Sequence, residues 1–262
     1  MAPIVDVRRV SKAFQIPSVR RDTVREHVFG VFERRGFDRL VALDEVSFGL
    51  EPGETLGIMG RNGSGKSTLL RIVCGIYPPD RGSVVLNAAI TPILELGVGW
   101  NPELDAVDNV YLLASVMGLS LRAIRARLDS ILAFAELERF AELKLKFYSS
   151  GMAARLAYAV AFSAVREVLI LDEIFSVGDA GFKARCEERC RALRAQGRSV
   201  ILVSHDPRVV RAFCDRVLLL ERGRIVMNGE AAAVVDRYLD ITRTAPGSQV
   251  SSLPEQVERA TV

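Results

Sequence analysis

Residues 55–70 read TLGIMGRNGSGKSTLL, and the architecture expected for the chain follows from this stretch. Its first part, Thr55–Met59, is a short apolar run of the kind that forms a buried strand. A glycine-rich turn comes next, and a helical pattern then covers Ser67–Cys74 and ends at Gly75. The sequence therefore predicts a strand, a glycine-rich loop and a helix in direct succession.

The turn between that strand and helix has the spacing G-x-x-x-x-G-K-S, typical of loops that bind the phosphates of a nucleoside triphosphate. Glycines let backbone N–H groups approach the phosphate oxygens, and the following helix presents its positive end. Lys66 is expected to reach the β- and γ-phosphates, and the Ser67 hydroxyl to bind the accompanying Mg²⁺. The alternative is a chance glycine-rich turn, and the agreement of spacing, residue types and context argues against it. The expected nucleotide-binding residues are Gly60, Arg61, Asn62, Gly63, Ser64, Gly65, Lys66, Ser67 and Thr68.

Two carboxylates end a later apolar run. Val168–Leu171 predicts a buried strand, and Asp172 and Glu173 follow it directly. Because the ends of parallel strands lie beside the nucleotide-binding loop, Asp172 is expected to hold Mg²⁺ and Glu173 to polarise the water that attacks the γ-phosphorus. Taken alone, such a pair is more often only a strand terminus. The phosphate loop upstream makes it a candidate catalytic site.

A histidine follows another expected strand at the same edge of the sheet. Val200–Val203 is strongly apolar, and His205, one of two histidines in the chain, comes shortly after it. There His205 would donate a hydrogen bond to the γ-phosphate and help to orient the attacking water. For this residue by itself, a surface or helix-capping histidine is the alternative.

Strands and helices alternate in the second half of the chain. The strands at 168–171 and 200–203 enclose a charged helix, Gly181–Ala195, and a further strand is expected at Val217–Leu220. This alternation predicts an α/β fold with a mostly parallel sheet covered on both faces. Residues from about 101 to 163 read as helical and are expected to form a helical lobe.

The N-terminal part differs in composition from the rest of the chain. Short β-favouring runs at Ile4–Val7 and Val41–Leu50 flank a segment at about 17–40 that is rich in Arg and Phe and looks inserted. A basic amphipathic helix is expected in this insertion, lying on a membrane surface or a partner, or packed on its own domain. Its apolar face would carry Val24, Val28, Val31 and Phe32.

Composition limits the classes of function. The net charge of +3 gives no case for a nucleic-acid partner. The longest apolar stretch, Leu156–Val165, is shorter than the roughly 20 residues that cross a bilayer, and no signal peptide is recognisable, so a cytoplasmic chain is expected. Residues 241–262 are polar and are expected to form a disordered tail. The cysteines lack metal-site spacing and are expected to be reduced thiols: Cys74, Cys186, Cys190 and Cys214.

A further motif carries a resemblance to a known family. Tyr148-Ser149-Ser150-Gly151-Met152 stands at the head of an expected helix, shortly before the strand that ends in two carboxylates. With these motifs in this order, the chain from about 7 to about 240 resembles the nucleotide-binding subunits of ABC transporters, whose signature motif usually reads Leu-Ser-Gly-Gly-Gln. The resemblance implies an ABC ATPase domain over 1–240. Its fold would be a P-loop NTPase core with a mostly parallel sheet, an N-terminal antiparallel β part and a helical lobe.

In this family two copies face each other head to tail, and ATP at the phosphate loop of one is covered by the signature residues of the other. The resemblance therefore implies a homodimer in which Ser149, Ser150 and Gly151 of a second copy bind the nucleotide. At a helix start, Ser149 and the Gly151 N–H would add donors for the γ-phosphate. Ser176–Asp179 matches the family's loop across the dimer contact, usually Ser-Ala-Leu-Asp.

Several departures from the usual motifs resemble the branch that exports cell-surface polysaccharides such as O-antigen and teichoic acid. They are the Tyr-Ser-Ser-Gly-Met signature, the Val-Gly-Asp dimer loop, Leu94–Trp100 and the insertion. The resemblance implies an ATP-hydrolysing subunit on the cytoplasmic face of the inner membrane, paired with a separate permease that moves a lipid-linked polysaccharide outward. Glu95 stands about where other members place a glutamine that reaches Mg²⁺. Phe14 matches the aromatic that stacks on adenine, with a core phenylalanine as the alternative.

Two other functions were weighed against export. An ABC ATPase that drives another solute, including import, has the same chemistry. A soluble ABC ATPase acting on ribosomes or DNA belongs to a different class. Such ribosome factors carry two motor domains, the DNA-repair members carry long coiled-coil insertions, and this sequence shows neither.

Overall fold

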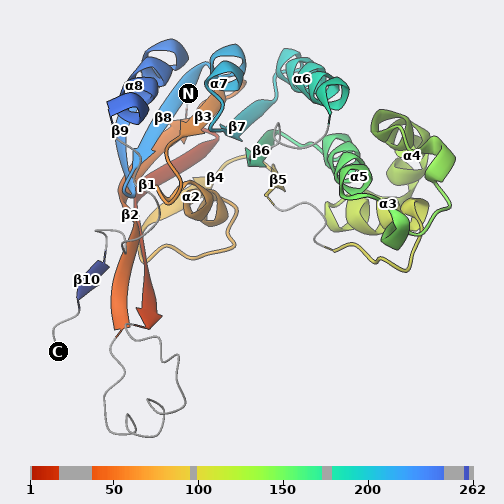
Figure 1. Cartoon of the computed structure of the whole chain (residues 1–262), viewed down its shortest axis with the longest axis horizontal. Helices are drawn as coiled ribbons and strands as arrows, with labels where there is room; N and C mark the ends of the chain where they lie inside the picture. Colours follow the sequence, from red (N-terminus) through yellow and green to blue (C-terminus); the bar gives the residue numbers. More distant parts are fainter. Residues whose placement is uncertain (1, 18–36, 95–98, 173–178, 245–256, 260–262) are drawn as a thin grey trace, which may run out of the picture.

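Two β-sheets form the centre of the molecule in the computed structural model, which describes residues 2–17, 37–94, 99–172, 179–244 and 257–259 (Figure 1). A four-stranded antiparallel sheet has the order β10-β2-β1-β4. A six-stranded sheet has the order β5-β6-β7-β3-β8-β9 and is parallel except for β9. The strands are β1 (Val5–Pro17), β2 (Phe37–Leu50), β3 (Thr55–Met59), β4 (Arg81–Leu86), β5 (Ile90–Ile93), β6 (Val168–Asp172), β7 (Ser199–Val203), β8 (Arg216–Glu221), β9 (Arg224–Glu230) and β10 (Val257–Arg259).

Both faces of the six-stranded sheet are covered, as its apolar strands require. Along β6, Val168 and Ile170 belong to a core shared with α2 and the antiparallel sheet. Leu169 and Leu171 point to the other side, into a core shared with α6, α7 and α8. The predicted α/β class is therefore confirmed. The helices are α2 (Lys66–Val73), α3 (Ala106–Val116), α4 (Leu121–Ala135), α5 (Ser150–Ser163), α6 (Ala180–Ala195), α7 (Pro207–Phe213) and α8 (Ala231–Thr244), with short 3-10 turns at Glu138–Phe140 and Leu145–Phe147.

Helices α3, α4 and α5 pack around a core of their own, and Figure 1 shows them as a lobe beside the sheet. Each begins at a capping side chain that accepts a hydrogen bond from the first turn, namely Asp105, Ser120 and Ser149. The fully buried Asn109 ties the entry to this lobe, because its amide donates to the carbonyls of Asn101, Leu104 and Asp105. The lobe is thus a separate packing unit that carries the start of α5.

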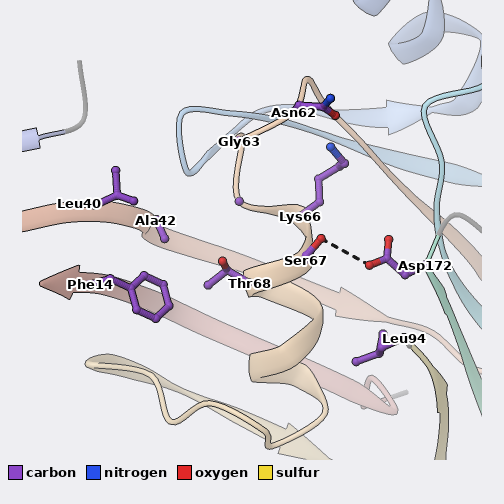
Figure 2. Close-up of a pocket in the computed structure, with 11 residues that line it drawn as sticks. Phe14, Leu40, Ala42, Asn62, Gly63, Lys66, Ser67, Thr68, Leu94 and Asp172 are labelled. Carbon is purple, nitrogen blue, oxygen red and sulfur yellow. Dashed lines mark hydrogen bonds between the residues drawn. The ribbon is translucent and has the colours of Figure 1, made fainter. Parts of the chain in front are cut away.

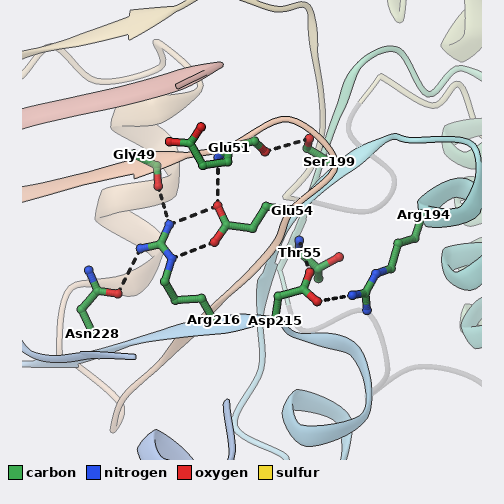
Figure 3. Close-up of polar contacts among 9 residues, drawn as sticks. All are labelled: Gly49, Glu51, Glu54, Thr55, Arg194, Ser199, Asp215, Arg216 and Asn228. Atoms are coloured by element: carbon green, nitrogen blue, oxygen red, sulfur yellow. Dashed lines mark hydrogen bonds and ion pairs between the residues drawn. The ribbon is translucent and has the colours of Figure 1, made fainter. Parts of the chain in front are cut away.

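A polar network fastens the two sheets together at the end remote from the glycine-rich loop (Figure 3). The Arg216 guanidinium on β8 binds both carboxylate oxygens of Glu54, at 2.7 and 3.1 Å, and the Gly49 carbonyl at 2.6 Å. Next to it, Asp215 accepts from the Thr55 N–H at 2.9 Å and pairs with Arg194 of α6. Bidentate, partly buried contacts of this kind fix the orientation of both side chains, so the start of β3 is anchored from both sheets.

The strands of the N-terminal hairpin extend further than the sequence predicts. β1 continues to Pro17, and β2 begins at Phe37, because the antiparallel ladder runs on through pairs such as Phe14 with Leu40. Residues 37–40 therefore belong to β2 and not to the insertion expected at 17–40, whose residues 18–36 lie outside the described part. At the other end of the chain, α8 runs past residue 240 to Thr244, and β10 pairs with β2.

Two further expectations concern the state of the cysteines and the length of the helices. All four cysteines are free thiols, as predicted. Burial raises the pKa of Cys186, Cys190 and Cys214 to about 12, so these thiols stay protonated and unreactive at neutral pH. Within the ranges that the structure describes, none of the helices has the length and apolar composition needed to cross a bilayer.

Candidate active site

The loop between β3 and α2 opens on a pocket of about 620 Å³ (Figure 2). One side is polar and comes from this loop, the first turn of α2 and the end of β6. The other side is apolar and comes mainly from the β1–β2 hairpin. The lining residues are Phe14, Leu40, Ala42, Asn62, Gly63, Gly65, Lys66, Ser67, Thr68, Leu94 and Asp172.

Glycines are required at both ends of the loop. Gly60 has φ +154°, and a Cβ there would lie 2.3 Å from the Leu220 carbonyl oxygen. Gly65, with φ +106°, is the N-cap of α2, and its Cβ would lie 2.5 Å from the Ala42 carbonyl oxygen. The loop therefore passes closely between β2 and β8, and the free N–H groups of α2 begin at the pocket.

Lys66 lies inside this loop and is only 7% exposed. Its ammonium donates to the carbonyls of Gly60 at 2.8 Å and Arg61 at 3.0 Å. Figure 2 shows the Lys66 side chain beside the turn that Asn62 and Gly63 form. Of the residues predicted for this loop, Gly60, Arg61 and Ser64 do not line the pocket. Among them, Ser64 is buried.

Ser67 and Asp172 meet at the polar end of the pocket. The Ser67 hydroxyl, in the first turn of α2, donates to Asp172 Oδ2 at the end of β6 over 3.4 Å (Figure 2). A hydroxyl and a carboxylate oxygen are donors that suit Mg²⁺. No set of three or more His, Cys, Asp or Glu side chains within the described ranges could hold a metal ion by itself. These two oxygens fit an ion whose remaining ligands are phosphate oxygens and water.

The opposite end of the pocket is apolar. Phe14 on β1 and Leu40 on β2 are cross-strand partners, and Ala42 follows on the same strand. The Phe14 ring also packs edge-on against Tyr77, with 5.8 Å between ring centroids. Phe14 therefore serves as a wall of the pocket and contacts Tyr77 beside it.

His205 lies close to Asp172 in the sheet but does not line the pocket. Asp172 pairs with Val203 of β7, and exposed His205 follows two residues later. The next residue, Asp206, caps α7 by accepting from the Arg208 N–H at 2.8 Å. The bonds and charge of Arg208 outweigh partial burial and lower the pKa of Asp206.

Residues 148–152 lie in the helical lobe at the start of α5, and none of them lines the pocket of the same chain. Ser149 is the N-cap of α5 and accepts from the Met152 N–H at 3.2 Å. Both Ser149 and Ser150 are exposed at the start of this helix. One chain therefore presents two separate helix starts of the kind that suits an anion, those of α2 and α5.

The acidic side chain of Glu136 links α5 to α6. Glu136, which ends α4 in a left-handed conformation, binds Arg155 of α5 at 2.9 Å and Arg185 of α6 at 2.8 Å. α6 in turn begins at Asp179, whose carboxylate accepts from the Phe182 N–H; this bond, helped by Arg155 and Arg185, lowers the pKa of Asp179. Glu95, Glu173 and 176–178, which were also predicted to act, lie outside the described residues.

Sequence reasoning missed part of the apolar wall. Leu40 was assigned to the insertion, Ala42 was predicted only as part of a strand, and Leu94 was noted only as the start of the segment Leu94–Trp100. The pairing of Phe14 with Leu40 brings Leu40 to the site, although the segment 18–36 lies between the two residues in the sequence. Only the extended hairpin register could have revealed it.

Comparison with known proteins agrees with this geometry. The family model described as "ABC transporter" matches residues 43–176. The O-antigen export system ATP-binding protein RfbB of Klebsiella pneumoniae is 34% identical over 91% of this chain and 98% of its own length. The ABC transporter protein AbcA of Aeromonas salmonicida is 41% identical over 75% of this chain, and the match spans 64% of AbcA. The teichoic acids export ATP-binding protein TagH of Listeria innocua is 34% identical, over 88% of this chain and 68% of TagH.

Solved structures give the same answer. The dimeric ATP-binding cassette MJ0796, in a post-hydrolysis state bound to ADP and Pi, superposes with a TM-score of 0.70 at 25% identity. The match covers 87% of this chain and 98% of MJ0796. This chain therefore shares the overall fold of that cassette. The chain belongs to the ABC transporter family, as one of its ATP-hydrolysing cassettes.

Proposed function

We propose that the chain energises export of a lipid-linked cell-surface polysaccharide, acting as a head-to-tail dimer with a separate membrane permease. Residues 1–240 would be the ATPase domain, with its helical lobe at 101–163. The relatives named for O-antigen and teichoic acid export support the cargo. The permease would hold the subunit at the cytoplasmic face of the membrane.

The observation that carries the dimer is the environment of Gly151. This glycine lies in the first turn of α5 with an ordinary helical φ, and a Cβ there would meet only Ser149 Oγ, at 3.9 Å. Glycine weakens a helix relative to alanine, and nothing among the described residues of its own chain requires one here. A close approach from outside the chain would account for it. The phosphates of a nucleotide bound to a second copy are the partner that an exposed helix start suits.

ATP would enter each site with its phosphates at the start of α2. The Lys66 ammonium exchanges loop carbonyls for the β- and γ-phosphates, where its positive charge offsets theirs. Ser67 and Asp172 would hold Mg²⁺, which when bound neutralises charge between the β- and γ-phosphates. Phe14 would stack on adenine at the apolar end of the pocket. The remaining phosphate ligands would be backbone groups of the loop, together with Asn62 and Thr68.

Hydrolysis would use groups that follow the strands β6 and β7. Glu173 accepts a proton from the attacking water, and His205 donates a hydrogen bond to the γ-phosphate. Ser149, Ser150 and Gly151 of the second copy close the site and exclude bulk water. After cleavage, the link through the γ-phosphate between the two copies is lost, and the dimer opens. Glu95 would supply a further oxygen ligand to Mg²⁺.

Gly151→Ala should separate stability from activity. The methyl group has room in the isolated chain, so the free energy of unfolding should stay unchanged or rise by about 0.5 kcal/mol. Turnover of ATP should fall at least about ten-fold, because the methyl group lies where the second copy's γ-phosphate approaches. Melting temperature and phosphate release measure the two effects.

Gly229→Ala is the matched control, because Gly229 also has an ordinary φ and its nearest neighbour, Val234 Cγ2, is 3.8 Å from the added Cβ. It lies on β9, away from the pocket and α5, and should leave turnover unchanged. Wild-type turnover in Gly151→Ala would argue against a shared site.

Export can be tested in cells that depend on this chain for it. Replacing the gene with one encoding an inactive Lys66→Ala variant should remove polysaccharide from the surface and leave lipid-linked polymer inside. Surface labelling with a lectin or antibody, before and after permeabilisation, distinguishes the two pools. If the polymer still reaches the surface while another solute fails to cross, the cargo assignment is wrong although the ATPase assignment stands.

A further inference from the structure

We infer that Asp80 is a positioning residue for the nucleotide base, because it fixes the stretch of β1 that carries Phe14. The inference rests on the proposed ATP site, in which Phe14 is the platform for adenine. Asp80 itself does not line the pocket. It stands just before β4, in the connection that leads there from the end of α2.

Asp80 holds β1 by three hydrogen bonds. Its backbone N–H donates to the Ser11 carbonyl at 2.9 Å, and its carboxylate accepts from the Ala13 N–H at 2.7 Å and from Lys12 Nζ at 2.8 Å. The pairing of β1 with β4 ends at Ser11, and the register of β1 against β2 shifts on both sides of Lys12. The carboxylate thus replaces sheet pairing at the irregular point directly before Phe14.

Two side chains from this arrangement also contact the ring. The ammonium of Lys12, whose side chain is 14% exposed, lies 5.7 Å from the Phe14 ring centroid. Tyr77, from the same connection as Asp80, packs against Phe14 at 71° between ring planes. Asp80 keeps the ammonium in place, and Tyr77 limits rotation of the ring. The base platform is therefore held by the segment that follows the phosphate-binding helix.

The carboxylate is ionised in this role. Partial burial alone would raise its pKa, but the bonds from Lys12 and the Ala13 N–H, with the charges of Lys12 and Arg39, outweigh burial. The pKa of Asp80 is lowered as a result, so the contact persists at neutral pH. Sequence analysis did not single out Asp80, because its partner lies at residues 11–13, far away in the chain.

The decisive experiment compares a ligand that has a base with one that has none. Asp80→Ala should raise the KM for ATP about five-fold and leave kcat within about two-fold, because charge-assisted contacts of this kind contribute on that scale. Competitive inhibition by inorganic tripolyphosphate should not change, since it needs only the phosphate end. Asp80→Asn keeps an acceptor for the Ala13 N–H and should give a smaller rise. The Asn variant also serves if the Ala variant folds poorly.

Asp6→Ala is the matched control. Asp6 is on the same strand and pairs with Arg8 at 2.6 Å, but it does not line the pocket. Its replacement should leave the KM unchanged. An equal rise in the tripolyphosphate inhibition constant of Asp80→Ala would show a general loss of structure and overturn the inference.

A double-mutant cycle with Phe14→Ala distinguishes the inference from its premise. If Phe14→Ala leaves the KM unchanged, the base platform itself is wrong. If Phe14→Ala raises the KM, Asp80→Ala should add nothing in the Phe14→Ala background, because there is no ring left to position. The same five-fold effect in both backgrounds would mean that Asp80 does not act through Phe14.

Discussion

Replacing Lys66 by alanine is expected to reduce ATP hydrolysis at least about 100-fold, as removal of one preorganised charge at a reacting phosphate does. This ammonium lies within the loop, 2.8 Å from the Gly60 carbonyl oxygen, and it is the only lysine among the described residues that line the pocket. Without it, the negative charge that develops on the phosphates loses its nearest cation. Phosphate release by the purified chain measures the effect.

The fold should survive this change. Lys66 contributes two hydrogen bonds to loop carbonyls, so the free energy of unfolding should fall by no more than about 2 kcal/mol. Arg198→Ala is a suitable control, since Arg198 precedes β7 at the end of the sheet opposite the pocket. Normal turnover by Lys66→Ala, with the control also normal, would remove the loop from the proposed site.

Glu173→Gln is expected to trap a dimer with ATP bound. The amide keeps the size of the side chain but does not take a proton from water, so turnover should fall by about 10²- to 10⁴-fold. Asp172, the residue before it, is unchanged: its Oδ2 lies 3.4 Å from the Ser67 hydroxyl oxygen, and it remains able to hold Mg²⁺. ATP therefore binds, joins the two copies and persists. Size-exclusion elution should shift to the dimer position when ATP is added.

The Asp172→Asn variant, changed at the neighbouring position, should behave differently from Glu173→Gln. This change removes a ligand charge from the ion instead of the base from the water, so ATP should bind weakly and no dimer should accumulate. A Glu173→Gln variant that hydrolyses slowly yet stays monomeric at saturating ATP would contradict the head-to-tail arrangement.

The glycine-rich loop and the central strands could be predicted because their signals are local. The glycine spacing of 60–65 reflects conformations that other residues rarely adopt, and those positions do show positive φ at Gly60, Gly63 and Gly65. Strands such as β3 and β7 are buried along their whole length, which makes them continuous apolar runs. Because Asp172 ends one parallel strand and Ser67 follows the loop after another, they could be predicted to lie at the same edge of the sheet.

Other parts depend on pairing between distant segments. β4 is mostly exposed and has only the short apolar run Val84–Leu86, and it forms because it pairs with β1. β9 alternates exposed and half-buried residues at the edge of its sheet and pairs with β8. Leu40 reaches the pocket through the same kind of long-range register. Such contacts are set by the whole fold, and no short window of sequence reports them.

The fastening of the two sheets through Arg216 and Glu54 has a thermodynamic consequence. Since the hairpin and the parallel strands are joined behind the pocket, the gap between Phe14 and the phosphate loop is established during folding and does not await a ligand. Little reorganisation free energy is then lost within one subunit when nucleotide arrives. In the proposed dimer, more of the intrinsic binding energy would then remain to draw the two subunits together, which is the step that would drive transport.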